Sequence, residues 1–224
     1  MRLIQRPVDD HIHFIIVDAP AKYHDAIRGL AFGESTEGFV KVLPKQTPHL
    51  DSAFARFAEY LDTIIKQVTH ELPVPWEKAF EIFLHRVYSI EADWWVTGSL
   101  ALALRGLPIQ PGDIDLIVDG AGAIRWGQVL ADIMIEPVSS TNWFCKYWGR
   151  AFDHARIEWV GEVDPQSDFS YVRDYYLPSV NNLETIHWKG YKIRIPPIEP
   201  ALKMDEARGR LERVKLVRQA LNWD

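Results

Sequence analysis

Two aspartates separated by one residue are the side chains of this chain whose types and spacing most suggest chemistry. In Asp113-Ile114-Asp115 the carboxylates fall at positions i and i+2 of an expected strand, where they share one face and lie about 6.5 Å apart. Carboxylate oxygens are ligands that Mg²⁺ prefers, and two such ions about 3.5–4 Å apart would fit between the pair. The alternative, a turn residue plus a solvent-facing strand residue, is disfavoured because aspartate is depleted in strands and costly to bury unpaired. The spacing therefore predicts a site for divalent metal.

A glycine–serine pair precedes the first aspartate by a spacer of thirteen residues. We expect Gly98-Ser99 to end a short strand over residues 94–97 and to lead into a short helix over residues 99–105. Backbone N–H groups at a helix start lack acceptors within the helix, and a phosphate group is favoured there. Alone, the pair indicates no more than an ordinary helix N-cap. Together with the aspartates, it indicates metal-assisted phosphoryl or nucleotidyl transfer.

The order of these residues resembles the signature of the DNA polymerase β-like nucleotidyltransferase superfamily. That signature is a hydrophobic strand end, Gly-Gly or Gly-Ser, a spacer, and then Asp-hydrophobic-Asp/Glu-hydrophobic. Here Val96-Thr97 precede the glycine and Leu116 follows the second aspartate. The firm resemblance covers residues 93–119, extends loosely to residue 160, and does not include the first seventy residues.

The resemblance implies an activity and a set of roles. Members of the superfamily transfer a nucleoside monophosphate from a nucleoside triphosphate to a hydroxyl or phosphate acceptor, using a divalent metal. Asp113 and Asp115 would bind Mg²⁺, or Mn²⁺ in its place, and join it to the triphosphate, which is the co-substrate. Gly98 and Ser99 would hold the β- and γ-phosphates. Catalysis would consist of positioning and charge neutralisation around an in-line displacement.

Members of the superfamily also use a third carboxylate from a neighbouring strand, as a metal ligand and as the base that removes the acceptor proton. Glu158 is the strongest candidate, because it is an acidic residue within the apolar-rich segment 155–160. Asp153 and Glu162 are its rivals. The alternative for Glu158 is an exposed strand position paired with Arg156 or another neighbour. If none of the three acids faces the aspartate pair, activity is in doubt.

Basic residues are expected to contact the triphosphate. Lys203 lies near the start of the expected C-terminal helix and is similar to a lysine that related enzymes use for phosphate. Arg105 follows the short helix and is a second candidate, either for the phosphates or for the acceptor. Arg208 and Arg210 are expected to belong to a solvated helix face with ordinary ion pairs.

Composition limits the kinds of partner. The formal net charge is −6 and the pI is about 5.8, whereas a sequence-independent nucleic-acid binder carries a basic footprint. The acceptor is expected to be a small molecule, a protein hydroxyl or an RNA end, with the acidic charge weighing against RNA. The single cysteine, Cys145, excludes an intrachain disulfide and indicates a reducing compartment. No early apolar run is long enough for a signal peptide or a membrane span, so we expect a cytoplasmic protein without a membrane partner.

The remaining sequence provides the elements that position these residues. Apolar residues at helical spacing predict helices, and short apolar runs between glycine and proline predict strands. The expected helices are residues 52–71, 75–88, 99–105, 123–133 and a single one from 199 to about 221. The expected strands are residues 11–17, 94–97, 114–118, 142–148, 155–160 and a hairpin over 185–195, while residues 21–50 are interpreted as short strands or loops.

These elements predict an α/β (α+β) protein with a small mixed β-sheet of the nucleotidyltransferase type flanked by helices. A helical C-terminal segment and an N-terminal α/β extension complete the expected fold. The extension, which has no assigned role, is placed at residues 1–74, and the core with the C-terminal helix at residues 75–224. The sequence leaves open the oligomeric state, the base of the triphosphate and the identity of the acceptor.

Two other functions fit the same residues. The fold could serve as a catalytically silent binding or antitoxin-like module, and the third carboxylate is the feature that would distinguish this module from an enzyme. An Asp-x-Asp glycosyltransferase would use the aspartates to hold a metal-bound sugar nucleotide. Such glycosyltransferases are typically longer and do not require a Gly-Ser pair and a short helix upstream.

Overall fold

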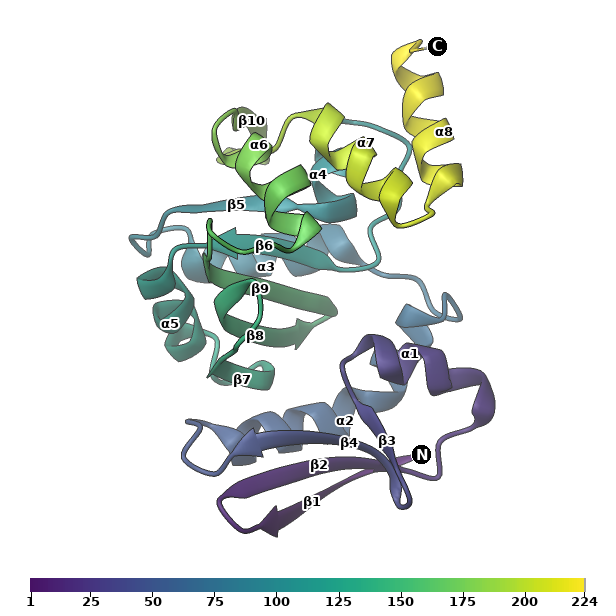
Figure 1. The fold of residues 1–224 in the computed structure, drawn as a ribbon, viewed down its shortest axis with the longest axis vertical. Helices are drawn as coiled ribbons and strands as arrows, with labels where there is room; N and C mark the ends of the chain where they lie inside the picture. The colour runs from purple at the N-terminus through teal and green to yellow at the C-terminus, as the bar shows by residue number, and fades with distance from the viewer. Residues whose placement is uncertain (224) are drawn as a thin grey trace.

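The computed structural model describes residues 1–223, which form two larger β-sheets joined by a long helix and a separate two-stranded sheet (Figure 1). The first sheet is antiparallel, with strand order β1-β2-β4-β3. Its strands are β1 (Arg2–Val8), β2 (His11–Val17), β3 (Gly33–Ser35) and β4 (Gly38–Pro44), and α1 (His24–Gly29) lies between β2 and β3. The expected strand over residues 11–17 is confirmed. Strand β1 was not expected, because an edge strand tolerates Pro7 and buries only Leu3 of its seven residues.

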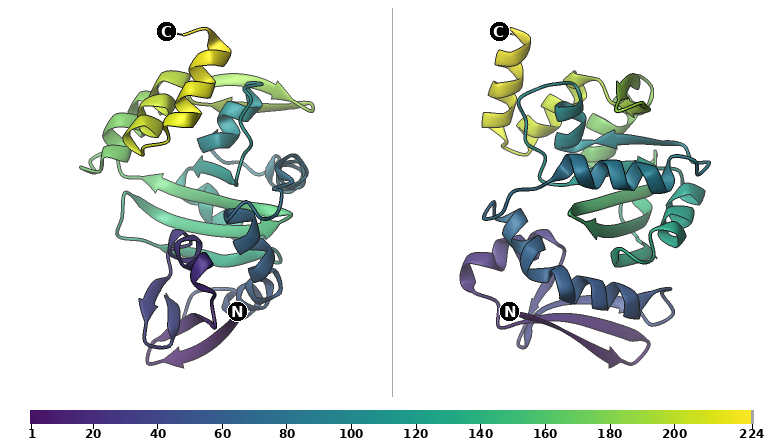
Figure 2. Two further views of the ribbon diagram at one scale, coloured as in Figure 1. Left: turned by 90° about the vertical axis from the view of Figure 1, so that its right-hand side faces the viewer. Right: turned by 180° about the vertical axis from the view of Figure 1, so that it is seen from behind.

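Helix α2 (Leu50–Val68) connects the two sheets (Figure 2). It packs on β1 and also on β7, the near edge of the second sheet. Its apolar residues Phe57, Leu61 and Ile65 are buried in a cluster that also contains Ile135 and Phe152 of the second sheet. The first part of the chain therefore completes its hydrophobic core with residues from the second sheet. The division between residues 74 and 75 stays a prediction.

The second sheet has five strands in the order β5-β6-β9-β8-β7. These are β5 (Trp94–Thr97), β6 (Ile114–Val118), β9 (Ala155–Val163), β8 (Cys145–Asp153) and β7 (Met134–Ser140). Strands β6 and β9 are parallel, and the other pairs are antiparallel. The sheet is therefore mixed, as expected, and β6 and β9 present residues of matching register side by side.

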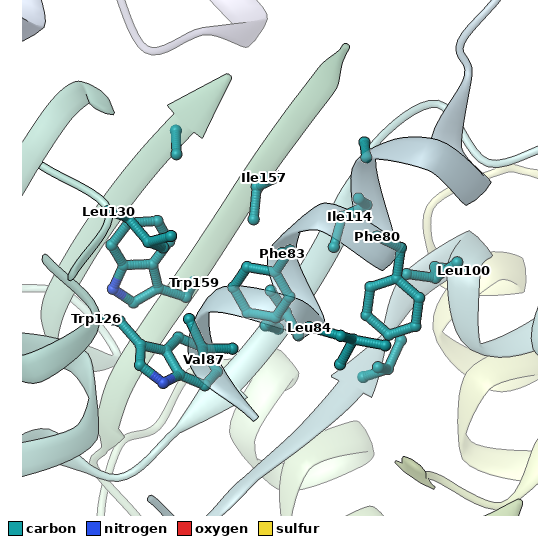
Figure 3. Packing of buried hydrophobic residues seen from close by; sticks show 14 of the residues in the cluster. Phe80, Phe83, Leu84, Val87, Leu100, Ile114, Trp126, Leu130, Ile157 and Trp159 are labelled. Carbon is teal, nitrogen blue, oxygen red and sulfur yellow. The ribbon is translucent and has the colours of Figure 1, made fainter. Parts of the chain in front are cut away.

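One face of the second sheet is covered by α3 (Trp76–Val87) and α5 (Gly120–Val129). Figure 3 shows the large aromatic residues of this core, with the ring of Phe83 5.1 Å from that of Trp126. Along β6, Ile114, Leu116 and Val118 point into this core. Because side chains alternate along a strand, Asp113 and Asp115 must point to the opposite face.

The opposite face is covered in part by C-terminal elements. A π-helical turn, η2 (Tyr171–Tyr176), runs into α6 (Leu177–Val180), and the hairpin β10 (Glu184–Trp188) and β11 (Tyr191–Ile195) follows. Two helices, α7 (Ile198–Ala207) and α8 (Leu211–Leu221), then end the described chain. Because η2 and α7 cover only part of this face, a space remains between the sheet and the C-terminal helices.

Three expectations about secondary structure are corrected. The expected single C-terminal helix is two helices, because Gly209 has φ of +69° and breaks the run. The helix expected over residues 123–133 is α5, which begins at Gly120 and ends at Val129, and the unexpected strand β7 follows it. The helical segment η2–α6 was not expected either. The hairpin over residues 185–195 is confirmed, with its turn formed by Lys189 and Gly190 at positive φ.

The structure confirms the expected fold class, a mixed α and β protein with helices on both faces of a small mixed sheet. Cys145 is buried. No helix formed by residues 1–223 is long and apolar enough to cross a membrane.

Candidate active site

A cavity of about 560 Å³ lies over the polar face of the second sheet. Five of the residues predicted for the site lie in its wall: Gly98, Ser99, Asp113, Asp115 and Glu158. The structure thus brings together the glycine–serine bend, the aspartate pair and the third acid. The rest of the wall comes from α7 and α8, from aromatic residues and from the N-terminal part; it includes Arg208, Arg210, Arg213, Trp143, Phe144, Trp148, Tyr171, Tyr175, Gln67 and His70.

The bend lies directly against the second aspartate. Strand β5 pairs with β6 so that Thr97 is opposite Asp115. The next residue, Gly98, has φ of +64°, a conformation that side-chain-bearing residues rarely adopt. A Cβ at this position would also collide with Oδ2 of Asp115. Glycine is therefore required here for its backbone conformation and for the close approach of the carboxylate.

We expect Gly98→Ala to lower the free energy of unfolding by more than the strain of positive φ alone, which is about 1–2 kcal/mol. The overlap with Asp115 adds a further cost of about 1–3 kcal/mol. Gly106→Ala is the matched control, because Gly106 has φ of +82° with open space where a Cβ would lie. Urea unfolding of both variants measures the difference. Equal losses in the two variants would contradict the close approach of Gly98 and Asp115.

The two aspartates lie in different electrostatic environments although they share one face of β6. Asp113 accepts a hydrogen bond from Nη2 of Arg156. Asp115 forms no ion pair with any residue that the structure describes, and its Oδ2 faces Gly98. Burial, together with the negative charges of Asp113 and Glu158, raises the pKa of Asp115 well above its ordinary value. Asp115 is therefore the acid most in need of a cation.

Glu158 is the acid that the fold brings beside the pair, because β6 and β9 align it with Asp115. Its carboxylate is already engaged, since Oε1 lies 2.8 Å from Nε of Arg150 and 2.5 Å from Nε of Arg156. Burial alone would raise the pKa of Glu158, but the charges of the two arginines outweigh burial and lower it. Glu158 lies beside the aspartate pair, as the sequence predicted. Its roles as metal ligand and base stay predictions.

The rival acids lie elsewhere. Asp153 ends β8 and pairs with Nδ1 of His154 at 2.5 Å. Glu162 is exposed and pairs with Lys146 at 3.1 Å. Neither residue lies in the wall of the cavity, so Glu158 is the better candidate of the three.

Whether the site fits a divalent metal depends on these pairings. Within residues 1–223, no group of three or more His, Cys, Asp or Glu side chains is arranged to hold a metal ion. The reason is local, because Arg156 lies between Asp113 and Glu158. Mg²⁺ is commonly held by one or two carboxylates together with substrate phosphates and water. The residues therefore fit an ion held by Asp113 and Asp115 and completed by a bound phosphate.

The cations of the cavity are not those expected from the sequence. Lys203 is exposed, and neither it nor Arg105 lies in the cavity wall. Arg105 instead pairs with Glu184 at 2.7 Å and donates to the carbonyl of Pro196 at 2.5 Å. Lys203 was predicted to contact phosphate and Arg105 the phosphates or the acceptor; neither lines this cavity, and these roles stay predictions.

The cations in the cavity wall are arginines near the break between α7 and α8. Arg208, Arg210 and Arg213 lie in the wall, and buried Asp205 pairs with Arg210 at 3.1 Å and with Arg213 at 3.3 Å. Arg208 and Arg210 were expected on a solvated helix face because the helix was expected to continue through Gly209. The glycine between two arginines was the signal that could have revealed the break.

Aromatic side chains complete the wall. The ring of Trp143 lies 5.9 Å from that of Trp148 and 4.2 Å from that of Phe144. Tyr175 shares a hydrogen bond with the hydroxyl of Thr97, and burial raises the pKa of its phenol. These aromatic residues line the same cavity as the acids and the arginines.

Comparison with known proteins gives a limited result. No protein-family model matches the chain, and no curated protein matches it. Among solved structures, the chain is similar to a candidate nucleotidyltransferase from Thermotoga maritima, with 24% identity and a TM-score of 0.45 over 65% of this chain and 92% of the other. It is also similar to an antigenic nucleotidyltransferase-like protein from Paracoccidioides brasiliensis, with 12% identity and a TM-score of 0.40 over 64% and 75%. Both TM-scores lie below 0.5, so support for a function has to come from the residues of the cavity.

Proposed function

We propose that this chain is a nucleotidyltransferase that moves a nucleoside monophosphate from ATP or another nucleoside triphosphate to a hydroxyl or phosphate acceptor. One observation carries the proposal: Asp113, Asp115 and the Gly98-Ser99 bend line the same cavity, with Gly98 directly against the carboxylate of Asp115. A carboxylate pair and a glycine–serine bend suit the two ends of a metal-chelated triphosphate.

Each group of residues has a part in this reaction. The backbone and hydroxyl of the Gly98-Ser99 bend bind the terminal phosphates, and Arg208, Arg210 and Arg213 neutralise the negative charge of the polyphosphate. Asp113 and Asp115 would hold Mg²⁺, which when bound would supply charge neutralisation. Asp205 is a positioning residue, because its carboxylate fixes two of the three arginines.

The acceptor is a small molecule or a single protein hydroxyl. A cavity of about 560 Å³ falls within the range typical of small-ligand sites, about 300–1,000 Å³. The net charge of −6 opposes the approach of a long polyanion such as RNA. The wall residues Gln67 and His70 give the N-terminal part a place in acceptor binding.

The test is incubation with nucleoside triphosphates labelled at the α-phosphate, Mg²⁺ and a cell extract. Relative to the extract without the protein, we expect the label to enter one additional acceptor. The same experiment with γ-labelled triphosphate should add no label, because nucleotidyl transfer releases the γ-phosphate with pyrophosphate. Glu158→Gln should bind nucleotide and lose transfer if Glu158 is the base. The double variant Asp113→Ala/Asp115→Ala is the control, and undiminished labelling by it would refute the proposal.

A catalytically silent binding module is the second candidate. The observation that favours it is the pairing of Oε1 of Glu158 with both Arg150 and Arg156, which neutralises the third carboxylate beside the aspartates. Such a module would bind a triphosphate with the same residues but transfer label to nothing. A sugar-nucleotide enzyme would instead bind a nucleoside diphosphate sugar more tightly than a triphosphate.

A further inference from the structure

The guanidinium of Arg156 lies between two of the three acids of the cavity. Its Nη2 donates to Oδ2 of Asp113, and its Nε lies 2.5 Å from Oε1 of Glu158. Arg156 thus joins the first and third of the acids that would otherwise share metal ions. It takes up one oxygen of Asp113 and one oxygen of Glu158, while Asp115 pairs with no described cation.

Arg156 is fixed in this place by a chain of buried charges. Glu158 also pairs with Arg150 at 2.8 Å, and Arg150 pairs with Glu136 at 2.7 Å. Glu136 in turn accepts from Lys41 of β4 at 2.5 Å. If Arg156 swung out of the cavity, Asp113 would lose its ion pair, and a buried unpaired carboxylate is costly. The guanidinium of Arg156 is therefore held in the site by these ion pairs.

The charge balance favours one divalent ion. Asp113, Asp115 and Glu158 carry three negative charges, which Arg150 and Arg156 reduce to one. One divalent ion is then enough to receive the phosphates. A second divalent ion would lie within a few ångströms of a guanidinium, and like charges repel strongly in a partly buried site.

Arg156 also keeps capacity for a ligand. Its contacts with Asp113 and Glu158 use Nη2 and Nε, and none of the hydrogen bonds or ion pairs of the described residues uses its Nη1. Arginine presents five donors in a planar fork that suits phosphate oxygens. A guanidinium held between two carboxylates at the cavity wall can therefore bind an oxygen that a metal would otherwise bind.

We propose that Arg156 is a built-in cation that replaces one of the two metal ions, so that the site takes a single divalent ion with each nucleotide. The inference rests on the proposed function, since it concerns the same triphosphate site. It differs from that function in predicting a number of ions and the residue that sets this number.

The test is to count Mn²⁺ bound per nucleotide. Protein saturated with a non-hydrolysable ATP analogue is titrated with Mn²⁺, and the free ion is measured by electron paramagnetic resonance. We expect one bound ion per nucleotide in the unaltered protein and in Arg156→Lys. We expect two ions in Arg156→Gln, because Asp113 and Glu158 lose the guanidinium that joins them. Arg105→Gln is the matched control and should bind one ion, since Arg105 is a largely buried arginine outside the cavity.

The outcomes separate the two proposals. Two ions in the unaltered protein would overturn the inference and leave the nucleotidyltransferase proposal intact. One bound ion in a folded Arg156→Gln variant would also overturn the inference, because the number of ions would then be limited by something other than Arg156. Failure of the unaltered protein to bind nucleotide at all would overturn the proposed function itself. If Arg156→Gln does not fold, as judged by circular dichroism, the count in the unaltered protein decides alone.

Discussion

Asp115→Asn is expected to stabilise the fold while it abolishes metal-dependent nucleotide binding. Asp115 is partly buried beside two other carboxylates and has no ion-pair partner among the residues described, so its charge opposes folding. Removing that charge should raise the free energy of unfolding by at least about 1 kcal/mol, because an ionised carboxylate costs more to bury than a neutral amide of the same shape. The same change removes a ligand that the proposed metal needs, and affinity for Mg²⁺ and ATP should fall at least about 100-fold, on the order of 3 kcal/mol.

The pH dependence of this stabilisation follows from the raised pKa of Asp115. A carboxyl group with a raised pKa in the folded state costs stability when it is ionised, at pH values above that pKa. The gain from Asp115→Asn should therefore be complete at high pH and shrink as the pH falls toward the ordinary aspartate pKa of 3.8. Asp113→Asn is the matched control and should destabilise the fold, because it takes a carboxylate from Arg156. Urea unfolding and calorimetric titration check both effects, and a stability loss in Asp115→Asn would contradict the geometry.

Arg150→Met is expected to cost about 3–5 kcal/mol of stability, the range for breaking a buried ion pair from one side. Arg150 is 4% exposed and contacts Glu136, Glu158 and the carbonyl of Leu30. The substitution would leave Glu158 to Arg156 alone and Glu136 to Lys41 alone. Urea unfolding measures the loss.

A surface pair supplies the comparison for this prediction. Arg86 pairs with Asp132 at 2.7 Å, and Asp132 is 62% exposed, so Arg86→Met should cost no more than about 1 kcal/mol. The double variant Arg150→Met/Glu158→Gln should regain part of the loss, because it no longer leaves that carboxylate short of a partner. A cost for Arg150→Met as small as that of Arg86→Met would mean that the buried chain of charges does not hold the fold together.

The sequence predicted the part of the site that depends on local pattern. Residues Gly98 to Asp115 follow strand, bend, helix and strand in a fixed order, and each carries a strong local preference. Glu158 was predicted to be the third carboxylate because it is an acidic residue within an apolar-rich strand. Spacing along the chain decides the geometry of the bend and the aspartates, whereas the place of Glu158 beside Asp115 depends on the pairing of β6 with β9.

The sequence could not predict which cations face the acids. Arg156 and Arg150 lie on β9 and β8, and their pairing with Asp113 and Glu158 depends on how strands far apart in sequence are ordered in the sheet. Lys203 was chosen because it lies near the start of the final helix and is similar to a lysine of related enzymes, whereas the arginines in the cavity wall lie at and after the break at Gly209. Strand order and helix breaks are decided by tertiary contacts, which a local pattern does not contain.

The shared core beneath α2 means that the two halves of this molecule are inseparable as a physical unit. A fragment starting at residue 75 would leave Ile135 and Phe152 facing water and Glu136 without Lys41. Heat should therefore unfold both larger sheets in one transition. A different N-terminal sheet could replace the first one in evolution only if it also supplied a lysine for Glu136 and an apolar surface for Ile135 and Phe152.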